Sequence, residues 1–208
     1  MSANKSAATL QRRPLVKQLL DGAGDDLLVI AGLGSSNWDI TAAGDRPLNM
    51  PLWGSMGAPV GMGLGLAMAQ PTKRVLVITG DGDMLMSLGS LATVATQMPE
   101  NLAIVVLDNE KFGETGNQAT HTSPRNNGPT DSGAGTDLAM IARGCGIPDA
   151  TTVRESSEVA DFVKDVRTKK GPVFRLVKVM VEKLEFVMPP QDGAHLKDRF
   201  RQALLGHP

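Results

Sequence analysis

The chain has few of the residues that build disulfide-linked, thiolate-metal or nucleic-acid-binding proteins. Its 208 residues include one cysteine, Cys145, and no tyrosine. A single cysteine excludes an internal disulfide, a cysteine zinc cage and a cysteine-ligated iron–sulfur cluster within the chain. The 21 basic residues balance 22 acidic ones, for a net charge of -1. No basic stripe or block of like charge therefore indicates nucleic acid or a membrane surface as a partner.

Export and membrane insertion also lack support. The N-terminal residues contain no apolar core of the signal-peptide kind, so we expect a cytoplasmic protein. Residues 47–72 carry no charge, and their number alone would allow a membrane span. Pro51 and Pro59 interrupt this stretch, and a soluble helix packed on a sheet explains it more simply.

Short aliphatic runs alternate with helical patterns along the chain. The expected strands are 26–31, 74–79, 102–108 and 173–180, and the expected helices are 10–20, 55–70, 84–97, 138–143, 159–168 and 195–205. Continuously apolar strands are buried on both faces, which predicts an α/β fold with a doubly wound parallel sheet and helices on both faces. We expect a single domain over 1–208, with a core at about 12–182 and a C-terminal helical tail at about 183–208.

Polar residues follow two of these strands. If 74–79 and 102–108 are neighbouring parallel strands joined by a helix, Asp81 and Asn109 emerge side by side at the carboxyl edge of the sheet, where such folds bind ligands. A carboxylate and an amide carbonyl are hard oxygen ligands suited to Mg²⁺, which fills its remaining positions with phosphate and water. A helix starting after Gly82 would favour an anion. The pattern predicts a metal and a phosphorylated ligand.

The residues 109–137 are rich in Gly, Asn, Ser, Thr and Pro, and they are more numerous than a structural connection needs. Loops of this length in compact domains tend to be functional or disordered. We expect a lid over the site; a surface insertion is the alternative.

Three motifs carry a family resemblance. The "GDG" at 80–82 followed by "DN" at 108–109 is similar to the thiamine-diphosphate motif, a Gly-Asp-Gly and an Asn-Asn roughly thirty residues apart. The "WGSMG" at 53–57 resembles the segment that holds this cofactor bent, and "AGLGSS" at 31–36 resembles the turn that contacts its diphosphate. The sequence looks most like the sulfopyruvate and phosphonopyruvate decarboxylases from about Arg12 to Leu205, including "GPVFRLVKV" and "LKDRF" near the C-terminus.

The resemblance implies roles for individual residues. The Gly54 carbonyl would accept a hydrogen bond from the 4'-amino group of the cofactor, and Met56 would wedge under its two rings; these are the catalytic candidates. Mg²⁺ would be held by Asp81, Asn109 and the backbone carbonyl of Lys111. The cofactor-binding segments together comprise Gly34, Ser35, Ser36, Gly54, Met56, Gly80, Asp81, Gly82, Asp83, Asn109, Lys111 and Gly113.

Two positions depart from the family pattern. Asp108 stands where the first Asn of the pair is usual, but the resemblance assigns the metal to Asn109. Asp83 stands where a small hydroxyl residue is common, and its carboxylate would repel a diphosphate unless it turned away. We expect Asp83 to act as a helix N-cap, worth about 1 kcal/mol.

Relatives with a complete site carry a second α/β domain whose glutamate activates the cofactor. Nothing in the sequence resembles that domain, and Glu100, Glu110 and Glu114 lie in the wrong one. The resemblance therefore implies a β subunit whose active site is completed by a separate pyrimidine-binding subunit, in a hetero-oligomer of α₂β₂ or larger. The activity would be decarboxylation of a 2-oxo acid to an aldehyde with thiamine diphosphate and Mg²⁺.

Substrate recognition has weaker candidates. A sulfonate or phosphonate would be recognised by cationic side chains, and the long loop offers His121 and Arg125; both are also ordinary residues of a solvated loop. The segment 113–118 could line the mouth of the site or form a simple turn.

Alternatives remain open. Another thiamine-dependent carbon–carbon lyase or synthase, of the acetolactate synthase type, would use the same motifs. The Asp-x-Asp at 81 and 83 also resembles the haloacid-dehalogenase-like phosphatases, although that motif normally opens its domain. A subunit that binds the cofactor without turnover is the third alternative.

Overall fold

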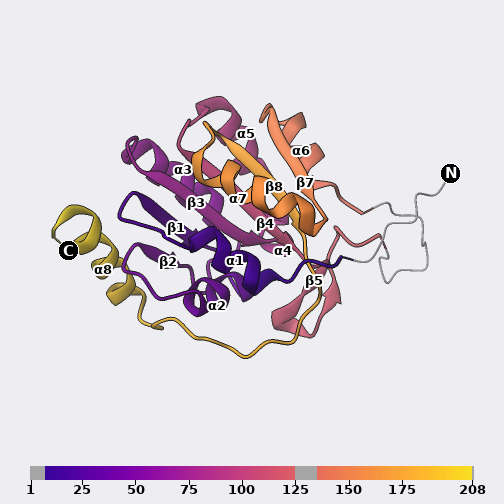
Figure 1. Ribbon diagram of the computed structural model, residues 1–208, viewed down its shortest axis with the longest axis horizontal. Coiled ribbons are helices and arrows are strands. Elements are labelled where there is room, and N and C mark those ends of the chain that lie inside the picture. Colours follow the sequence, from indigo (N-terminus) through magenta and orange to yellow (C-terminus); the bar gives the residue numbers. More distant parts are fainter. Residues whose placement is uncertain (1–7, 125–134, 208) are drawn as a thin grey trace.

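A computed structural model describes residues 8–124 and 135–207. Six parallel strands form the central sheet (Figure 1), in the order β2 (Asn49–Pro51), β1 (Leu27–Ala31), β3 (Arg74–Gly80), β4 (Leu102–Asp108), β8 (Val173–Lys178) and β7 (Asp149–Val153). The helices are α1 (Arg12–Leu20), α2 (Ser35–Ala42), α3 (Pro59–Ala69), α4 (Asp81–Leu85), α5 (Leu88–Gln97), α6 (Leu138–Gly144), α7 (Val159–Thr168) and α8 (Gly193–Leu205). The predicted doubly wound α/β fold is confirmed.

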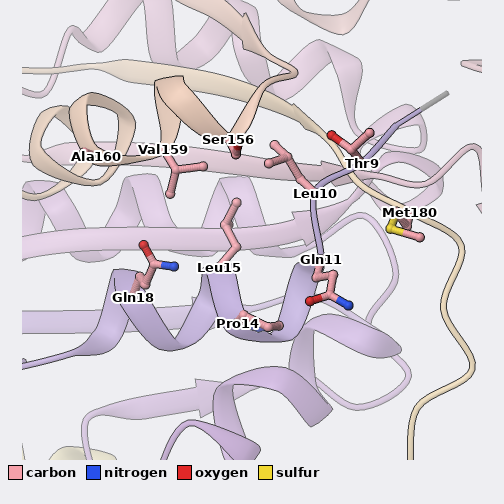
Figure 2. Close-up of a pocket in the computed structure, with 10 residues that line it drawn as sticks. All are labelled: Thr9, Leu10, Gln11, Pro14, Leu15, Gln18, Ser156, Val159, Ala160 and Met180. Atoms are coloured by element: carbon pink, nitrogen blue, oxygen red, sulfur yellow. The ribbon is translucent and has the colours of Figure 1, made fainter. Parts of the chain in front are cut away.

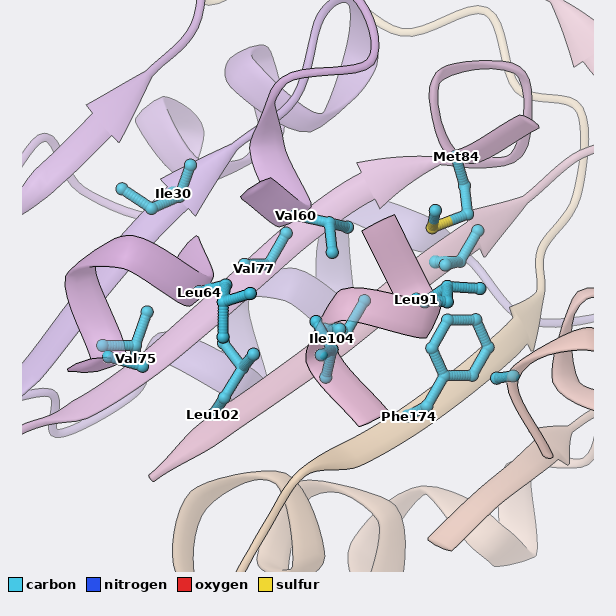
Figure 3. Packing of buried hydrophobic residues seen from close by; sticks show 14 of the residues in the cluster. Ile30, Val60, Leu64, Val75, Val77, Met84, Leu91, Leu102, Ile104 and Phe174 are labelled. Atoms are coloured by element: carbon cyan, nitrogen blue, oxygen red, sulfur yellow. The ribbon is translucent and has the colours of Figure 1, made fainter. Parts of the chain in front are cut away.

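Both faces of the sheet are buried because successive strand residues point to opposite sides. In β1, Leu28 and Ile30 pack with α3, α5, α6 and α8, whereas Leu27 and Val29 pack with α1, α2 and α7. Figure 3 shows the first of these two clusters, in which side chains of α3 and α5 cover strands β1, β3, β4 and β8. The two clusters hold the strands in one rigid sheet, and this fixes the positions of the strand ends.

The sequence missed several short elements and misplaced two helix boundaries. Strands β2 and β7, helix α2 and a two-stranded hairpin at 111–119 were not predicted. The expected helix 55–70 begins only at Pro59, because 53–58 forms a loop with left-handed glycines at Gly54 and Gly57. The expected helix 84–97 is two helices, because short-range bonds end α4: the Met86 and Ser87 amides bond to carbonyls three residues earlier.

The uncharged stretch 47–72 consists of β2, the loop and α3. Helix α3 lies against the sheet so closely that a Cβ on Gly63 would stand 2.2 Å from a Val77 methyl carbon. Within 8–124 and 135–207, no helix has the length and apolar character needed to cross a membrane.

The C-terminal segment after β8 crosses the molecule to the opposite edge of the sheet. It runs without regular structure from residue 179 to Asp192, whose side chain caps α8 by accepting from the Ala194 and His195 amides. Helix α8 then packs beside β2, and Arg199 pairs with Asp45 at 2.6 Å (Figure 1). This segment corresponds to the predicted helical tail.

Candidate functional site

The site forms where β3 and β4 end side by side. Gly80 and Leu107 are partners in the parallel register, so Asp81, the first residue of α4, lies level with Asp108, the last residue of β4. Asn109 is the next residue along the chain. The strand ends therefore meet at the edge that the sequence predicted.

Asp81 is a buried carboxylate within a hydroxyl network. Only 2% of the residue is exposed, and its Oδ2 accepts hydrogen bonds from the hydroxyls of Thr120 and Thr122, the latter at 2.9 Å. The Thr122 hydroxyl also lies 2.9 Å from Oδ1 of Asp108. Burial, together with the nearby charge of Asp108, raises the pKa of Asp81 to about 6, and the threonine hydroxyls partly oppose this. Asp81 is thus a buried carboxylate whose ionised form a bound cation would stabilise.

Lys178 neutralises the neighbouring carboxylate. It ends β8, directly opposite Asp108 in the register, and its Nζ lies 2.7 Å from Asp108 and 2.6 Å from Glu110. Asp108 is 1% exposed and Lys178 is 8% exposed, so this ion pair is buried. A buried charge needs such a partner. Of the two carboxylates that share the Thr122 hydroxyl, Asp108 therefore has a cation beside it and Asp81 has none among the described residues.

Side-chain turns shape the backbone after β4. Asp108 Oδ1 accepts from the Glu110 amide at 3.1 Å, and Asn109 Oδ1 accepts from the Lys111 amide at 3.0 Å. Glu110 between them has φ +62°, which lets its side chain return to Lys178. The two predicted ligand residues, Asn109 and Lys111, therefore occupy a fixed turn beside Asp81.

The expectation that Asp83 caps a helix is wrong. Asp83 lies inside α4, whose N-cap position is Gly80. Its carboxylate instead accepts from the Gly57 amide and, at 2.5 Å, from the Thr79 hydroxyl. Burial raises the pKa of Asp83, and hydrogen bonds from the backbone of Gly57, from Thr79 and from the backbone of Leu33 partly oppose this. The side chain therefore bonds to β3 and to loops distant in the sequence rather than to its own helix.

The 53–57 loop carries the predicted catalytic pair. Gly54 has φ +61° and no atom within 4 Å of the position its Cβ would take, so its backbone is open to approach. Met56 is half-buried. Gly57 has φ +87°, and a Cβ there would lie 3.2 Å from Cβ of Met86, so the loop is seated against the end of α4.

The turn after β1 holds the predicted diphosphate contacts. Gly34 has φ +82° and precedes α2, which begins at Ser35. The Ser36 hydroxyl is buried and has no hydrogen-bond partner among the described residues. A buried hydroxyl is costly without a partner, and an anion at this turn would supply one.

A small hairpin, β5 (Lys111–Phe112) and β6 (Gln118–Ala119), joined through the 3₁₀ turn η1 (Gly113–Thr115), covers the start of α4. Gly82 makes room for it, since a Cβ there would lie 2.5 Å from the Phe112 ring. On the same loop, the Glu114 carboxylate would be 3.3 Å from a Cβ on Gly34. The first part of the predicted lid is thus folded onto the site, while its role in closure stays a prediction.

Of the two substrate candidates, the structure describes His121 alone. It is exposed, and the next residue, Thr122, reaches Asp81. Arg125 lies outside the described residues.

Sequence reasoning missed Thr120, Thr122 and Lys178. The two threonines alternate in the loop, as residues facing one side of an extended chain do, and Lys178 is a charge at the end of an apolar strand. Neither signal identifies a partner until the sheet order is known.

A separate groove of about 480 Å³ lies between α1 and α7 (Figure 2). Its lining includes Leu10, Pro14, Leu15 and Val159, and none of the lining residues is charged. It contains none of the predicted site residues, and it offers no group for acid–base or metal chemistry.

The residues at the sheet edge fit a magnesium diphosphate. The described residues contain no cluster of three or more His, Cys, Asp or Glu side chains arranged for a metal, so the site would offer one carboxylate with amide and backbone oxygens. Mg²⁺ commonly takes one or two protein carboxylates and completes its shell with phosphate and water. The unpaired Ser36 hydroxyl and the bare backbone at Gly54 fit the rest of such a ligand.

Comparisons with known proteins find relatives over most of the chain. Among curated proteins, sulfopyruvate decarboxylase subunit beta of Methanocaldococcus jannaschii is 37% identical over 76% of this chain and 76% of its own length. Phosphonopyruvate decarboxylase of Streptomyces viridochromogenes is 30% identical over 95% of this chain and 47% of its own length. A solved thiamin diphosphate-dependent enzyme from Mycobacterium smegmatis, 19% identical, shares the fold with a TM-score of 0.65 over 88% of this chain and 35% of its own.

The family model for the C-terminal, cofactor-binding domain of thiamine pyrophosphate enzymes matches residues 34–177, a span that runs from the turn after β1 to the penultimate residue of β8. The chain belongs to the thiamine pyrophosphate enzyme family.

Proposed function

We propose that this chain is the cofactor-binding subunit of a thiamine-diphosphate-dependent 2-oxo acid decarboxylase of the sulfopyruvate or phosphonopyruvate type. One observation carries the proposal. The chain aligns with 76 to 92% of three relatives named sulfopyruvate decarboxylase subunit beta, at 32 to 37% identity. The buried Asp81 beside Asn109 supports the same reading, because a decarboxylase of this kind needs a metal diphosphate at this edge.

In the proposed enzyme each motif has a separate task. Asp81, Asn109 and the backbone carbonyl of Lys111 would hold Mg²⁺, and the turn at Gly34, Ser35 and Ser36 would hold the diphosphate. The Gly54 carbonyl would accept from the aminopyrimidine, and Met56 would keep the two rings bent. When bound, the cofactor supplies the electron sink that accepts the electrons left behind as CO₂ departs.

A partner chain would complete the site. The named relatives are subunits, which supports a hetero-oligomer, and we propose an α₂β₂ or larger assembly. The three glutamates considered from the sequence, Glu100, Glu110 and Glu114, are poorly suited to activate the cofactor. Glu110 is paired with Lys178, and Glu100 lies just before β4 begins, at the opposite edge of the sheet. Glu114 lies over the turn at Gly34, where the diphosphate is expected. The activating glutamate would come from the partner's pyrimidine-binding domain.

The two alternative enzyme classes, a carbon–carbon synthase and a phosphatase, differ in their support. Acetolactate synthase 2 of rice is 34% identical over 68% of this chain but only 22% of its own length. A carbon–carbon synthase is therefore the second candidate. The phosphatase interpretation is overturned by the family match. It would also need Asp83 as a general acid, whereas both oxygens of Asp83 already accept hydrogen bonds.

The test is calorimetric titration of the purified chain with thiamine diphosphate and Mg²⁺, first alone and then with the polypeptide encoded beside it. We expect binding that appears or tightens with the partner, followed by CO₂ release from sulfopyruvate or phosphonopyruvate. Adding a second 2-oxo acid as an acceptor separates a decarboxylase from a synthase. Binding without CO₂ release from any 2-oxo acid would favour a non-catalytic subunit, and no binding in either condition would refute the proposal.

A further inference from the structure

We propose that Asp83 is a positioning residue, whose carboxylate fixes the 53–57 loop and the turn after β1 against the helix that begins with Asp81. The inference rests on the proposed function only for its catalytic consequence. The anchoring itself is a property of this chain, and it can be tested without the cofactor.

The contacts of Asp83 join segments that are far apart in the sequence. Oδ1 accepts from the Gly57 amide, and Oδ2 accepts from the hydroxyl of Thr79 on β3. The backbone at Leu33, in the turn after β1, also donates to the carboxylate. Asp83 is only 4% exposed, so water does not compete for these donors. One side chain thereby links the three segments to which the motifs assign the metal, the diphosphate and the bent cofactor.

The turn after β1 is shaped around this carboxylate. A Cβ on Gly32 would lie 2.0 Å from Oδ2 of Asp83 and 2.6 Å from Oγ1 of Thr79. The absence of a side chain at Gly32 therefore lets the Asp83 carboxylate lie against the backbone of this turn. Gly34, the second glycine of "GLGSS", has a different role, because its φ of +82° is one that other residues rarely adopt.

The loop is held from two sides. Asp83 binds the amide of Gly57, and Met86, at the end of the same short helix, lies so near Gly57 that a Cβ added to this glycine would stand 3.2 Å from Cβ of Met86. Gly54 and Met56 lie within three residues of this anchor. Their positions relative to Asp81 therefore depend on a hydrogen bond made two residues further along α4.

The anchoring needs an acceptor at position 83. The Gly57 amide can only donate, whereas the Thr79 hydroxyl can donate or accept. Asparagine could therefore still accept from Gly57 through Oδ1 while its NH₂ group donates to Thr79, whereas alanine would leave the buried Gly57 amide unpaired. The aspartate at position 83, where the family often has a small hydroxyl residue, thus holds the 53–57 loop and β3 together.

The first experiment measures amide hydrogen exchange in the purified chain without cofactor, for wild type, Asp83→Ala and the control Asp161→Ala. Asp161 is an exposed aspartate on α7, on the other face of the sheet. We expect exchange at Gly57 to become about tenfold faster in Asp83→Ala and to stay unchanged in the control. Unchanged exchange at Gly57 in Asp83→Ala would overturn the proposal.

A second variant covers the case in which Asp83→Ala does not fold. Thr79→Val removes only the donor to Oδ2 and keeps the Gly57 bond to Oδ1, so Gly57 exchange should rise less than threefold while exchange in the turn at Leu33 and Gly34 increases. An equal rise throughout the chain in Thr79→Val would indicate general loosening and would also overturn the proposal.

The catalytic consequence is tested in the enzyme reconstituted with its partner. We expect kcat to fall about tenfold or more in Asp83→Ala, while the KM for the 2-oxo acid and the affinity for thiamine diphosphate change less than threefold. If wild-type enzyme releases no CO₂ from any 2-oxo acid, the proposed function fails and the exchange result still decides the anchoring. If wild type is active and the variant equals it, the inference fails and the proposed function stands.

Discussion

Replacing Asp81 with asparagine should stabilise the protein at neutral pH while destroying its metal site. Burial raises the pKa of Asp81 from 3.8 to about 6 in the folded state. Below pH 4 the carboxyl is protonated in both folded and unfolded chains. Between pH 4 and 6 the unfolded chain ionises first, so the stability contributed by Asp81 falls as pH rises. About two pH units correspond to about 3 kcal/mol.

The Asp81→Asn variant removes this pH dependence because it stays neutral. Without cofactor or metal, its free energy of unfolding should match that of wild type near pH 4 and exceed it by about 3 kcal/mol at pH 7. Urea denaturation followed by tryptophan fluorescence at pH 4, 5, 6 and 7 measures the difference. With an m value of roughly 2 kcal/mol/M, the midpoint should rise by about 1.5 M at pH 7. The same variant should lose Mg²⁺-dependent binding of thiamine diphosphate by about a hundredfold or more.

The exposed Asp161→Asn variant is the control for the loss of one carboxylate. A stability difference for Asp81→Asn that is the same at every pH would refute the reasoning, since it would mean that the folded protein does not raise the pKa of Asp81. Retained metal-dependent binding would separately refute the assignment of Asp81 as a ligand.

Three further predictions follow from the described contacts. Lys178→Met should cost about 3–5 kcal/mol of unfolding free energy in urea denaturation, because it leaves a carboxylate buried without its cation; adding Asp108→Asn should restore most of the loss, and additive effects would contradict the pairing. On α3, Gly63→Ala should cost about 1–3 kcal/mol, because its Cβ would overlap a valine of β3. Gly61→Ala on the same helix meets open space and should be neutral or stabilising by up to about 1 kcal/mol, so equal effects of the two would refute the close approach. In the reconstituted enzyme, Met56→Ala should lower kcat about ten- to a hundredfold with a smaller change in cofactor affinity; a pure loss of affinity would contradict its role in bending the cofactor.

The fold was predictable where local pattern and burial agree. The strands β1, β3, β4 and β8 are continuous aliphatic runs because helices cover both of their faces, and such runs are visible without knowledge of the partners. Strand β2 has three residues and β7 lies at the edge of the sheet with an exposed threonine, so neither carries an apolar run. Helix α2 contains a buried asparagine and a buried aspartate, Asn37 and Asp39, which weaken its apolar pattern.

The site was predictable to the extent that it depends on strand ends. The position of Asp81 beside the end of β4 follows from the lengths of one strand–helix–strand unit. The interactions of Asp83 do not, because its partners lie in loops whose shape depends on positive-φ glycines and on packing. A carboxylate near the start of a helix most often caps that helix, and here stronger, buried donors from other segments outcompete the local one.

The role of Asp108, which stands where the family usually has Asn, could not be predicted from the sequence because its partner is distant along the chain. Taken alone, a buried aspartate beside Asp81 would add a second negative charge at several kcal/mol. The register of β4 and β8 places Lys178 directly opposite Asp108, so the added charge is balanced by a residue seventy positions away. That pairing requires β8 to lie next to β4, and the order of the strands is a property of the whole sheet. The departure from the family pattern therefore pairs the added charge without cancelling it, since Lys178 also pairs with Glu110 and the charge of Asp108 still raises the pKa of Asp81. Replacing Lys178 alone would leave Asp108 buried without a cation.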